Sequence, residues 1–184
     1  MIPTKSTYRI PQINDFEHSM QLKILGLMYT VDLKWDAHVD QTIKKASQRI
    51  FILKKLKKFL PIQDLVRVYN AMIQSVVEYC APVMVGMTAK NSMKIEKLRR
   101  RCHRIICDNE CKCELLPPIS ERRLEQATRL FRRLTDPTHI LNHLIPDTLP
   151  RTKHYSIEAT HTDRRQRSFI PFTSLHLNQQ KQKI

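Results

Sequence analysis

The chain has 184 residues, of which 41% are hydrophobic, 2 are glycine and 10 are proline. So few glycines argue against an all-β fold with tight turns and against a glycine-rich phosphate-binding loop, so the composition favours helices interrupted by proline. The formal net charge is +15, from 32 Lys and Arg against 17 Asp and Glu. This excess indicates a polyanionic partner, for which nucleic acid and an anionic membrane surface are the usual candidates.

No apolar run approaches the roughly 18 residues that a membrane span needs, and the N-terminus lacks the apolar segment of a signal peptide. The five cysteines, an odd number, fit a reducing compartment. We therefore expect a soluble intracellular protein that is not a membrane protein, without distinguishing nucleus from cytoplasm.

Residues 1–36 are predicted to be extended. Asn14-Asp15 is a turn signal, and residues 8–10 and 22–25 on either side of it have β-compatible side chains in partial alternation. An isolated hairpin is marginally stable in water, so this one is expected to pack on other structure.

A first helix is predicted from Asp36 to Leu60, where Pro61 stops it. Its apolar residues recur in steps of four and three and form one stripe: Val39, Ile43, Ala46, Ile50, Leu53, Leu56 and Leu60. Its other faces carry seven cations and no acid after Asp40: Lys44, Lys45, Arg49, Lys54, Lys55, Lys57 and Lys58. Like charges one turn apart repel each other, so this helix is expected to face phosphates rather than water alone.

A second, broadly apolar helix is predicted from Gln63 to Cys80. Its Tyr69 and Tyr79 could stack on bases, but aromatic residues at this spacing are more often core residues, and we expect the core role. A third helix is predicted after Thr88, its possible N-cap. It pairs an apolar stripe with a basic stripe at the same spacing: Ile95, Leu98, Cys102 and Ile105 beside Lys94, Lys97, Arg101 and Arg104. The first and third helices can thus pack core to core and direct their cations toward one groove.

A fourth helix is predicted to begin at the cap Ser120 and to end near Leu134, with a short helix over 138–144 after it. Beyond Pro146 the chain is polar, basic and without a sustained period, so it is expected to be mostly disordered, with a possible docking point at 169–172.

Several motifs resemble, in order, the end of the reverse transcriptase of non-LTR retrotransposons of the jockey and chicken-repeat type. They are Lys23-Ile24-Leu25-Gly26, Leu33-Lys34-Trp35 followed by His38-Val39, residues 47–58, 69–79, 115–117, 120–124, 136–139 and 168–171. The resemblance implies that the last hairpin of a palm passes here into a helical thumb. The chain departs from the family at Met84, where a Trp is common, and over residues 1–9.

The expected fold is therefore mainly α, with a three-helix thumb-like bundle, an extra helical hairpin, a short β-hairpin-like N-terminal region and a disordered basic tail. The expected divisions are 1–36, the remnant of the palm end; 37–110, the bundle; 114–146, accessory helices; and 147–184, the tail.

The chemistry of a polymerase is not expected, because the family's active site includes two adjacent metal-binding aspartates and this sequence contains no Asp-Asp pair. We expect no enzyme activity, no cofactor and no catalytic metal.

Two other patterns in the sequence contain metal-ligand residues. Cys102, Cys107, Cys111 and Cys113, with His103, could hold zinc, but their spacing favours free thiols. His38-Val39-Asp40 matches the H-x-D of iron dioxygenases without a third ligand, although residues 43–80 resemble a segment at the N-terminus of some alkylation-repair dioxygenases.

The sequence thus predicts a catalytically incomplete fragment that grips an RNA–DNA hybrid or duplex by its backbone. The residues expected to contact phosphates are Lys44, Lys45, Arg49, Lys54, Lys55, Lys58, Lys94, Lys97, Arg101 and Arg104, with Arg122, Arg123, Arg132 and Arg133 as a second group. The alternatives are a protein-interaction module and a transposon relic without selected function.

Overall fold

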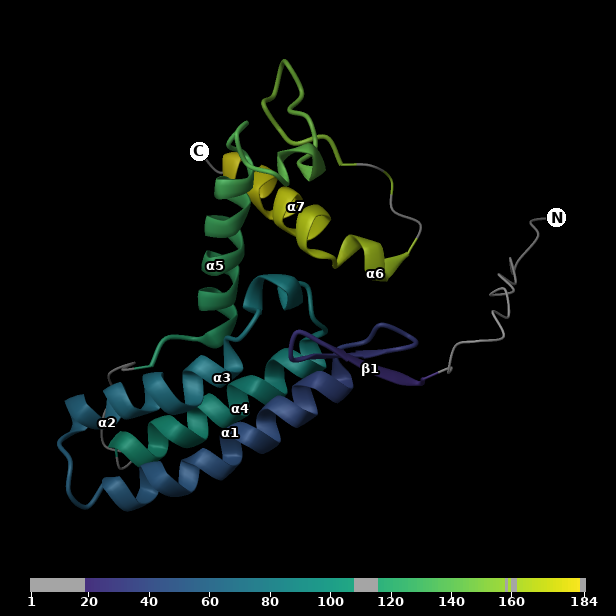
Figure 1. Cartoon of the computed structure of the whole chain (residues 1–184). Helices are drawn as coiled ribbons and strands as arrows, with labels where there is room; N and C mark the ends of the chain where they lie inside the picture. The colour runs from purple at the N-terminus through teal and green to yellow at the C-terminus, as the bar shows by residue number, and fades with distance from the viewer. Residues whose placement is uncertain (1–18, 108–115, 158, 160–161, 183–184) are drawn as a thin grey trace.

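The computed structural model describes residues 19–107, 116–157, 159 and 162–182. Within them the chain is mainly helical and has a two-stranded antiparallel hairpin near its N-terminus, which confirms the expected fold class (Figure 1). The predicted turn at Asn14-Asp15 lies outside the described residues. None of the helices in this part of the chain is both long and apolar enough to cross a membrane.

The elements follow one another in a simple order. They are β1 (Gln21–Ile24), β2 (Leu27–Thr30), α1 (Asp36–Leu56), α2 (Ile62–Tyr69), the π-helical turn η1 (Asn70–Gln74), α3 (Ser75–Val77), the 3-10 turn η2 (Ala81–Met84), α4 (Ala89–Cys107), α5 (Ile119–Leu134), the 3-10 turn η3 (Asn142–Leu144), α6 (Asp163–Gln166) and α7 (Phe169–Lys181). The short helix predicted over 138–144 is thus reduced to η3.

The hairpin turns at Leu25 and Gly26, which both have positive φ angles, 47° and 83°. Two consecutive positive φ angles define the type I′ turn that suits the twist of a two-residue hairpin. Tyr79 holds this turn, because its hydroxyl donates a hydrogen bond of 2.7 Å to the Leu25 carbonyl. The side chain of Tyr79 is 49% exposed, so the prediction of a core role for it is wrong.

The hairpin rests on the start of α1. Leu27 is buried, and the backbone N–H of Met28 donates a 3.3 Å hydrogen bond to Nδ1 of His38. Burial, with a contribution from the Lys45 charge, lowers the pKa of His38, which favours the neutral ring that can accept this bond. The hairpin therefore gains the tertiary support that two strands alone lack.

Three helical rods form the bundle: α1, the continuous rod α2–η1–α3, and α4 (Figure 1). The predicted stripe of α1 is confirmed, because Val39, Ala46, Ile50 and Leu53 are all at most 2% exposed. The helix ends at Leu56 rather than Leu60, although the N–H of Leu60 still donates to the Leu56 carbonyl at 3.0 Å. Pro61 has no N–H with which to continue this pattern.

The middle rod ends at Val77, three residues before the predicted Cys80, which adopts a left-handed conformation with φ 53°. Tyr69, at 1% exposure, is a core residue as predicted. The π-helical turn departs from regular α-helical bonding, and the Met72 carbonyl in it accepts a 2.5 Å hydrogen bond from Nη1 of Arg49. Arg49, a cation of α1, therefore holds the middle rod.

Helix α4 completes the core with Ile95, Leu98 and Cys102. The predicted cap Thr88 is confirmed, because its Oγ1 accepts a 3.4 Å hydrogen bond from the N–H of Asn91. Helices α1 and α4 run in the same direction, with the middle rod antiparallel to both (Figure 1).

Helix α5 begins at Ile119, and the predicted cap role of Ser120 is wrong because Ser120 lies within the first turn. A tertiary partner replaces the local cap: the N–H of Ile119 donates to Oε2 of Glu96 on α4 at 3.4 Å. One turn later, Nε and Nη2 of Arg122 contact the two carboxylate oxygens of Glu78 at 2.5 and 3.2 Å. These contacts anchor α5 to the bundle.

The predicted disorder of the tail is wrong for residues 163–181, which form α6 and α7. Helix α7 lies against α5, and Phe169 packs on Phe131 with 6.3 Å between ring centroids. Apolar periodicity does not predict this helix, because its buried face is largely polar. On that face Thr173, Ser174 and Asn178 lie beside Leu177. Asn178 compensates for its burial by bonding both the N–H and the carbonyl of Tyr155, at 2.8 and 3.0 Å.

Gly86 is the point where the C-terminal helices meet the bundle. It is buried in the turn between η2 and α4, and a Cβ atom at this position would overlap the backbone carbonyl of Arg167, between α6 and α7. Glycine is therefore required here for close approach of two backbones rather than for an unusual φ angle.

We predict that Gly86→Ala loosens the C-terminal helices and lowers the free energy of unfolding by about 1–3 kcal/mol, because the added methyl overpacks the contact with Arg167. Hydrogen–deuterium exchange should rise over residues 163–181 and stay unchanged in α1 and α4. The control is Gly26→Ala, which strains the hairpin at φ 83°. Unchanged exchange over 163–181 in Gly86→Ala would contradict the assignment.

Glu78 generates a second prediction. Burial of this carboxyl opposes its ionisation, but hydrogen bonds from Arg122, Gln74 and Gln126 outweigh that effect and hold the pKa below its ordinary 4.5. The contribution of ionised Glu78 to the free energy of unfolding is therefore complete above pH 4.5 and is lost as the pH falls through the lowered pKa of Glu78 in the folded chain. Glu78→Gln should cost about 1–2 kcal/mol near neutral pH.

Urea unfolding across a pH series measures this difference, which should shrink toward zero as Glu78 of the parent chain becomes protonated. Glu125→Gln is the matched control, because Glu125 meets Arg129 in an exposed pair at 3.1 Å and should change stability little. A difference for Glu78→Gln that persists unchanged into strong acid would disprove the linkage.

Candidate nucleic-acid interface

The seam between α1 and α4 is defined by an ion pair of 2.5 Å between Lys94 Nζ and Asp40 Oδ1. Residues that follow Asp40 or Lys94 in steps of three and four lie on the same flank of their helices. On the α1 side these include Lys44, Lys54 and Lys55, with Lys58 in the turn just after the helix. On the α4 side they include Lys97, Arg101 and Arg104, with Lys90 one turn before Lys94. We call these eight residues the α1–α4 basic face.

All eight residues of the basic face are exposed. Within the part of the chain that the structure describes, no carboxylate lies within ion-pair distance of Lys44, Lys54, Lys58, Lys97 or Arg101. The acidic residue of α4, Glu96, is directed toward α5 and pairs with Arg99 at 2.5 Å. The face therefore keeps nearly all of its positive charge for an external partner.

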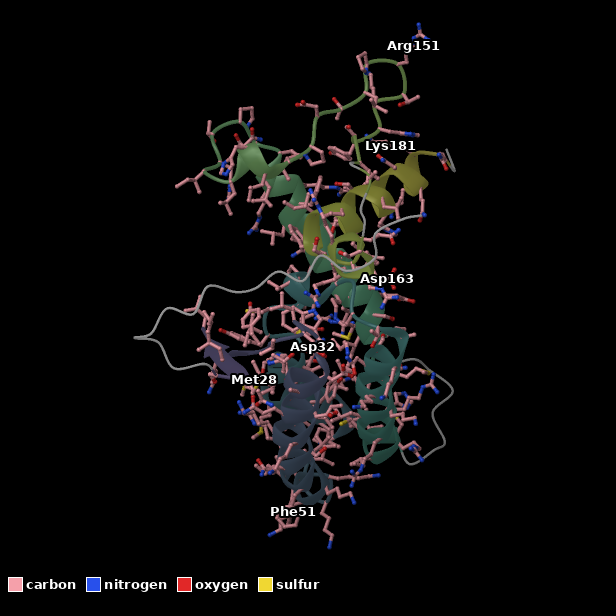
Figure 2. The ribbon with its side chains drawn as sticks, turned by 90° about the vertical axis from the view of Figure 1, so that its right-hand side faces the viewer. Met28, Asp32, Phe51, Arg151, Asp163 and Lys181 are labelled. Atoms are coloured by element: carbon pink, nitrogen blue, oxygen red, sulfur yellow. The ribbon has the colours of Figure 1, made fainter. Side chains whose placement is uncertain are left out.

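Phe51 lies among these cations and is 60% exposed. Nζ of Lys55 stands 4.6 Å from the centre of its ring. Figure 2 shows Phe51 at one end of the molecule, opposite the end at which Arg151 lies. An exposed aromatic ring between lysines is a surface on which a base can stack.

Three of the ten predicted contact residues do not belong to the basic face. Lys94 lies on the seam but is neutralised by Asp40. Arg49 holds the Met72 carbonyl, so it faces the middle rod instead. Lys45, one turn before Arg49, lies on that same flank, away from α4. The remaining seven predicted residues belong to the basic face.

Lys90 is a residue that the sequence analysis missed. It is exposed and precedes Lys94 by one turn, so extension of the α4 basic stripe by four residues could have found it.

The second group of predicted arginines also contains both residues held within the fold and residues that face outward. Arg123 is only 3% exposed, and its burial lowers the pKa of its guanidinium, so its predicted contact with phosphate is wrong. Arg122 is held by Glu78. Arg132 and Arg133 are exposed on α5, outside the basic face. Position along the sequence did not distinguish the arginines that hold the fold from those that face outward.

The cysteine cluster does not form a site in the described residues. Cys102 is fully buried in the bundle core, and burial raises the pKa of its thiol to about 12. Sγ of Cys107 lies 3.8 Å from Nε2 of His103. Cys111 and Cys113 lie outside the described residues, and within those residues no three metal ligands converge.

The two residues of the H-x-D motif, His38 and Asp40, contact different partners. His38 bonds Met28 and lies 3.4 Å from the Thr42 hydroxyl through Nε2, whereas Asp40 pairs with Lys94. The two side chains therefore do not face a common centre at which iron could be bound.

Comparison of the chain with protein-family models, with curated proteins and with solved structures found no match.

Proposed function

We propose that this chain binds the phosphate backbone of a nucleic-acid duplex through the α1–α4 basic face. The observation that carries the proposal is the alignment of two parallel helices that share a core and place eight exposed cations along one seam, on which Asp40 is paired with Lys94. Adjacent like charges repel, so a surface of this kind is stabilised when a polyanion binds.

The dimensions of the face suit a duplex. From Asp40 to Leu56, where the helix ends, the α1 side extends about 24 Å at 1.5 Å per residue. A duplex strand presents one phosphate about every 3.4 Å along its axis, so a face of this length spans about seven phosphates. Lysine and arginine contacts to phosphates supply affinity and register without reading base sequence.

The resemblance to non-LTR retrotransposon reverse transcriptases makes an RNA–DNA hybrid the proposed ligand. In that reading the bundle is the thumb of an RNA-directed DNA polymerase, and the hairpin is the end of its palm. Because this sequence has no Asp-Asp pair, we propose a binding role without catalysis.

A second candidate function, binding of another polypeptide, is favoured by the hairpin. Every residue of β1 is exposed, and the apolar side chains of Leu22 and Leu25 are 56% and 85% exposed. An exposed strand edge with apolar side chains is a surface that another chain can cover. Such binding depends weakly on salt, so a salt series separates the two candidates.

We predict that Lys44→Glu with Arg101→Glu reduces the affinity for an RNA–DNA hybrid at least about tenfold at low salt, because one residue from each helix is lost from the face. The slope of log affinity against log salt should become shallower by about 2, since each lost phosphate contact removes about 0.9. Fluorescence anisotropy of a labelled hybrid measures both quantities.

The matched control is Lys45→Glu with Arg132→Glu, which changes the net charge equally at exposed positions outside the face. Its effect should be several-fold smaller. Equal losses in the two double variants would show that net charge, and not this face, determines binding. Circular dichroism checks that both variants keep their helices.

We also predict that Asp40→Asn strengthens hybrid binding about two- to fivefold, because Lys94 loses its carboxylate partner and becomes available to a phosphate. The salt slope should steepen by about 0.9. The control is Asp64→Asn, which removes the exposed pair with Arg67 on α2. Weaker binding in Asp40→Asn would contradict the place of Lys94 on the interface.

A further inference from the structure

A cavity of about 520 Å³ lies where three distant segments meet. Its walls come from the end of the hairpin and the start of α1, from the turn before α4, and from the segment that carries α6 and the start of α7. In Figure 2, Asp32 and Asp163, which line two of these walls, lie near the junction of the bundle with the C-terminal helices. The volume is within the range of small-ligand sites.

The cavity has an aromatic lining. Tyr29, Trp35 and Phe169 contribute rings from three different elements. The rings of Tyr29 and Trp35 are already in contact, with centroids 5.6 Å apart and planes inclined by 57°. Flat aromatic surfaces of this kind stack against planar heterocycles.

One polar group in the lining lacks a partner. Asn91 is 1% exposed, and its side-chain Oδ1 accepts no hydrogen bond from the described residues. An unpaired buried acceptor costs free energy, which a ligand with an N–H donor would recover. The unpaired atom is the side-chain carbonyl oxygen Oδ1, which is an acceptor, whereas the backbone N–H of Asn91 donates to the Thr88 cap.

The rim of the cavity carries charge of both signs. Arg164 and Arg167 lie on one side of it. On the hairpin side, hydrogen bonds from Thr30 and Lys34 lower the pKa of Asp32 to about 2, so this carboxylate is ionised at neutral pH. A ligand there meets guanidinium groups that suit a phosphate and a carboxylate that suits hydroxyl or amino donors.

The cavity is also continuous with the basic face. Asp36 and Asn91 line it, and the seam begins one turn further along each helix, at Asp40 and Lys94. One helical turn is about 5.4 Å, so the cavity lies about that far beyond the start of the seam. A strand that follows the basic face toward the helix N-termini therefore arrives at the cavity.

We propose that this cavity binds an unpaired nucleobase that bears an exocyclic amino group, stacked on Trp35 and donating a hydrogen bond to Oδ1 of Asn91. The inference rests on the proposed function for the link to a bound strand, but the same chemistry would also retain a free nucleotide. The amino group distinguishes adenine, cytosine and guanine from a base without one.

The test uses the intrinsic fluorescence of the full chain, because Trp35 is its single tryptophan. AMP is titrated against two probes, purine riboside 5′-monophosphate, which lacks only the amino group, and ribose 5-phosphate, which lacks the base. We expect AMP to change the Trp35 emission at about five- to tenfold lower concentration than purine riboside 5′-monophosphate. Ribose 5-phosphate should leave the emission unchanged.

Asn91→Leu should abolish the preference for AMP over purine riboside 5′-monophosphate. Because this change could also disturb the start of α4, Phe169→Leu provides a second variant, which should weaken both purine ligands equally. An effect of ribose 5-phosphate equal to that of AMP, or no response to AMP in the parent chain, overturns the proposal.

A separate arm identifies the source of the base. Hybrids with a blunt end, an adenine overhang or an abasic overhang are compared by Trp35 emission and by anisotropy. A response to the adenine overhang alone supports capture of a base from a bound strand, whereas a response confined to AMP supports a free nucleotide as the ligand. If no hybrid binds but AMP still changes the Trp35 emission, the proposed function fails and the cavity assignment stands. If hybrids bind but AMP does not change the emission, the cavity assignment fails and the proposed function stands.

Discussion

The packing of α1 against α4 is the constraint on which the rest of the structure depends. The apolar stripes of both helices are buried where the two helices lie side by side and against the middle rod, and this arrangement also brings their basic stripes together. The repulsion that results costs a few tenths of a kcal/mol per pair, whereas each buried aliphatic side chain contributes about 1.5–3 kcal/mol. Core burial therefore stabilises a concentration of positive charge that the helices alone would avoid.

The C-terminal helices depend on a different set of contacts, in which hydrogen bonds accompany the packing of rings on Phe131. Glu78 bonds Arg122, Glu96 bonds the start of α5, and Asn178 bonds the backbone of Tyr155. Polar contacts of this kind require defined geometry, and Gly86 permits the close backbone approach that completes them. This part of the molecule also closes the third wall of the cavity, so the cavity exists only when α6 and α7 are docked.

The two proposals divide the recognition of a nucleic acid between two kinds of surface. The basic face offers long side chains on an exposed seam, which suits the regularly spaced phosphates of any sequence. The cavity offers aromatic rings and one buried acceptor, which suits a single base that has left its stack. Phe51, among the cations of the face, adds an exposed ring outside the cavity.

The sequence by itself determined the helical class, the core stripe of α1, the Thr88 cap and seven residues of the basic face, because these depend on local periodicity and on hydrogen bonds between near neighbours. The sequence could not determine which cationic side chains are held by contacts within the fold. Arg49, Lys94 and Arg123 look like their neighbours in sequence, and only tertiary contacts with Met72, with Asp40 and with the buried core separate them. Helix α7 and the cavity were likewise decided by tertiary structure, because a polar buried face leaves no hydrophobic period and a cavity joins segments more than 100 residues apart.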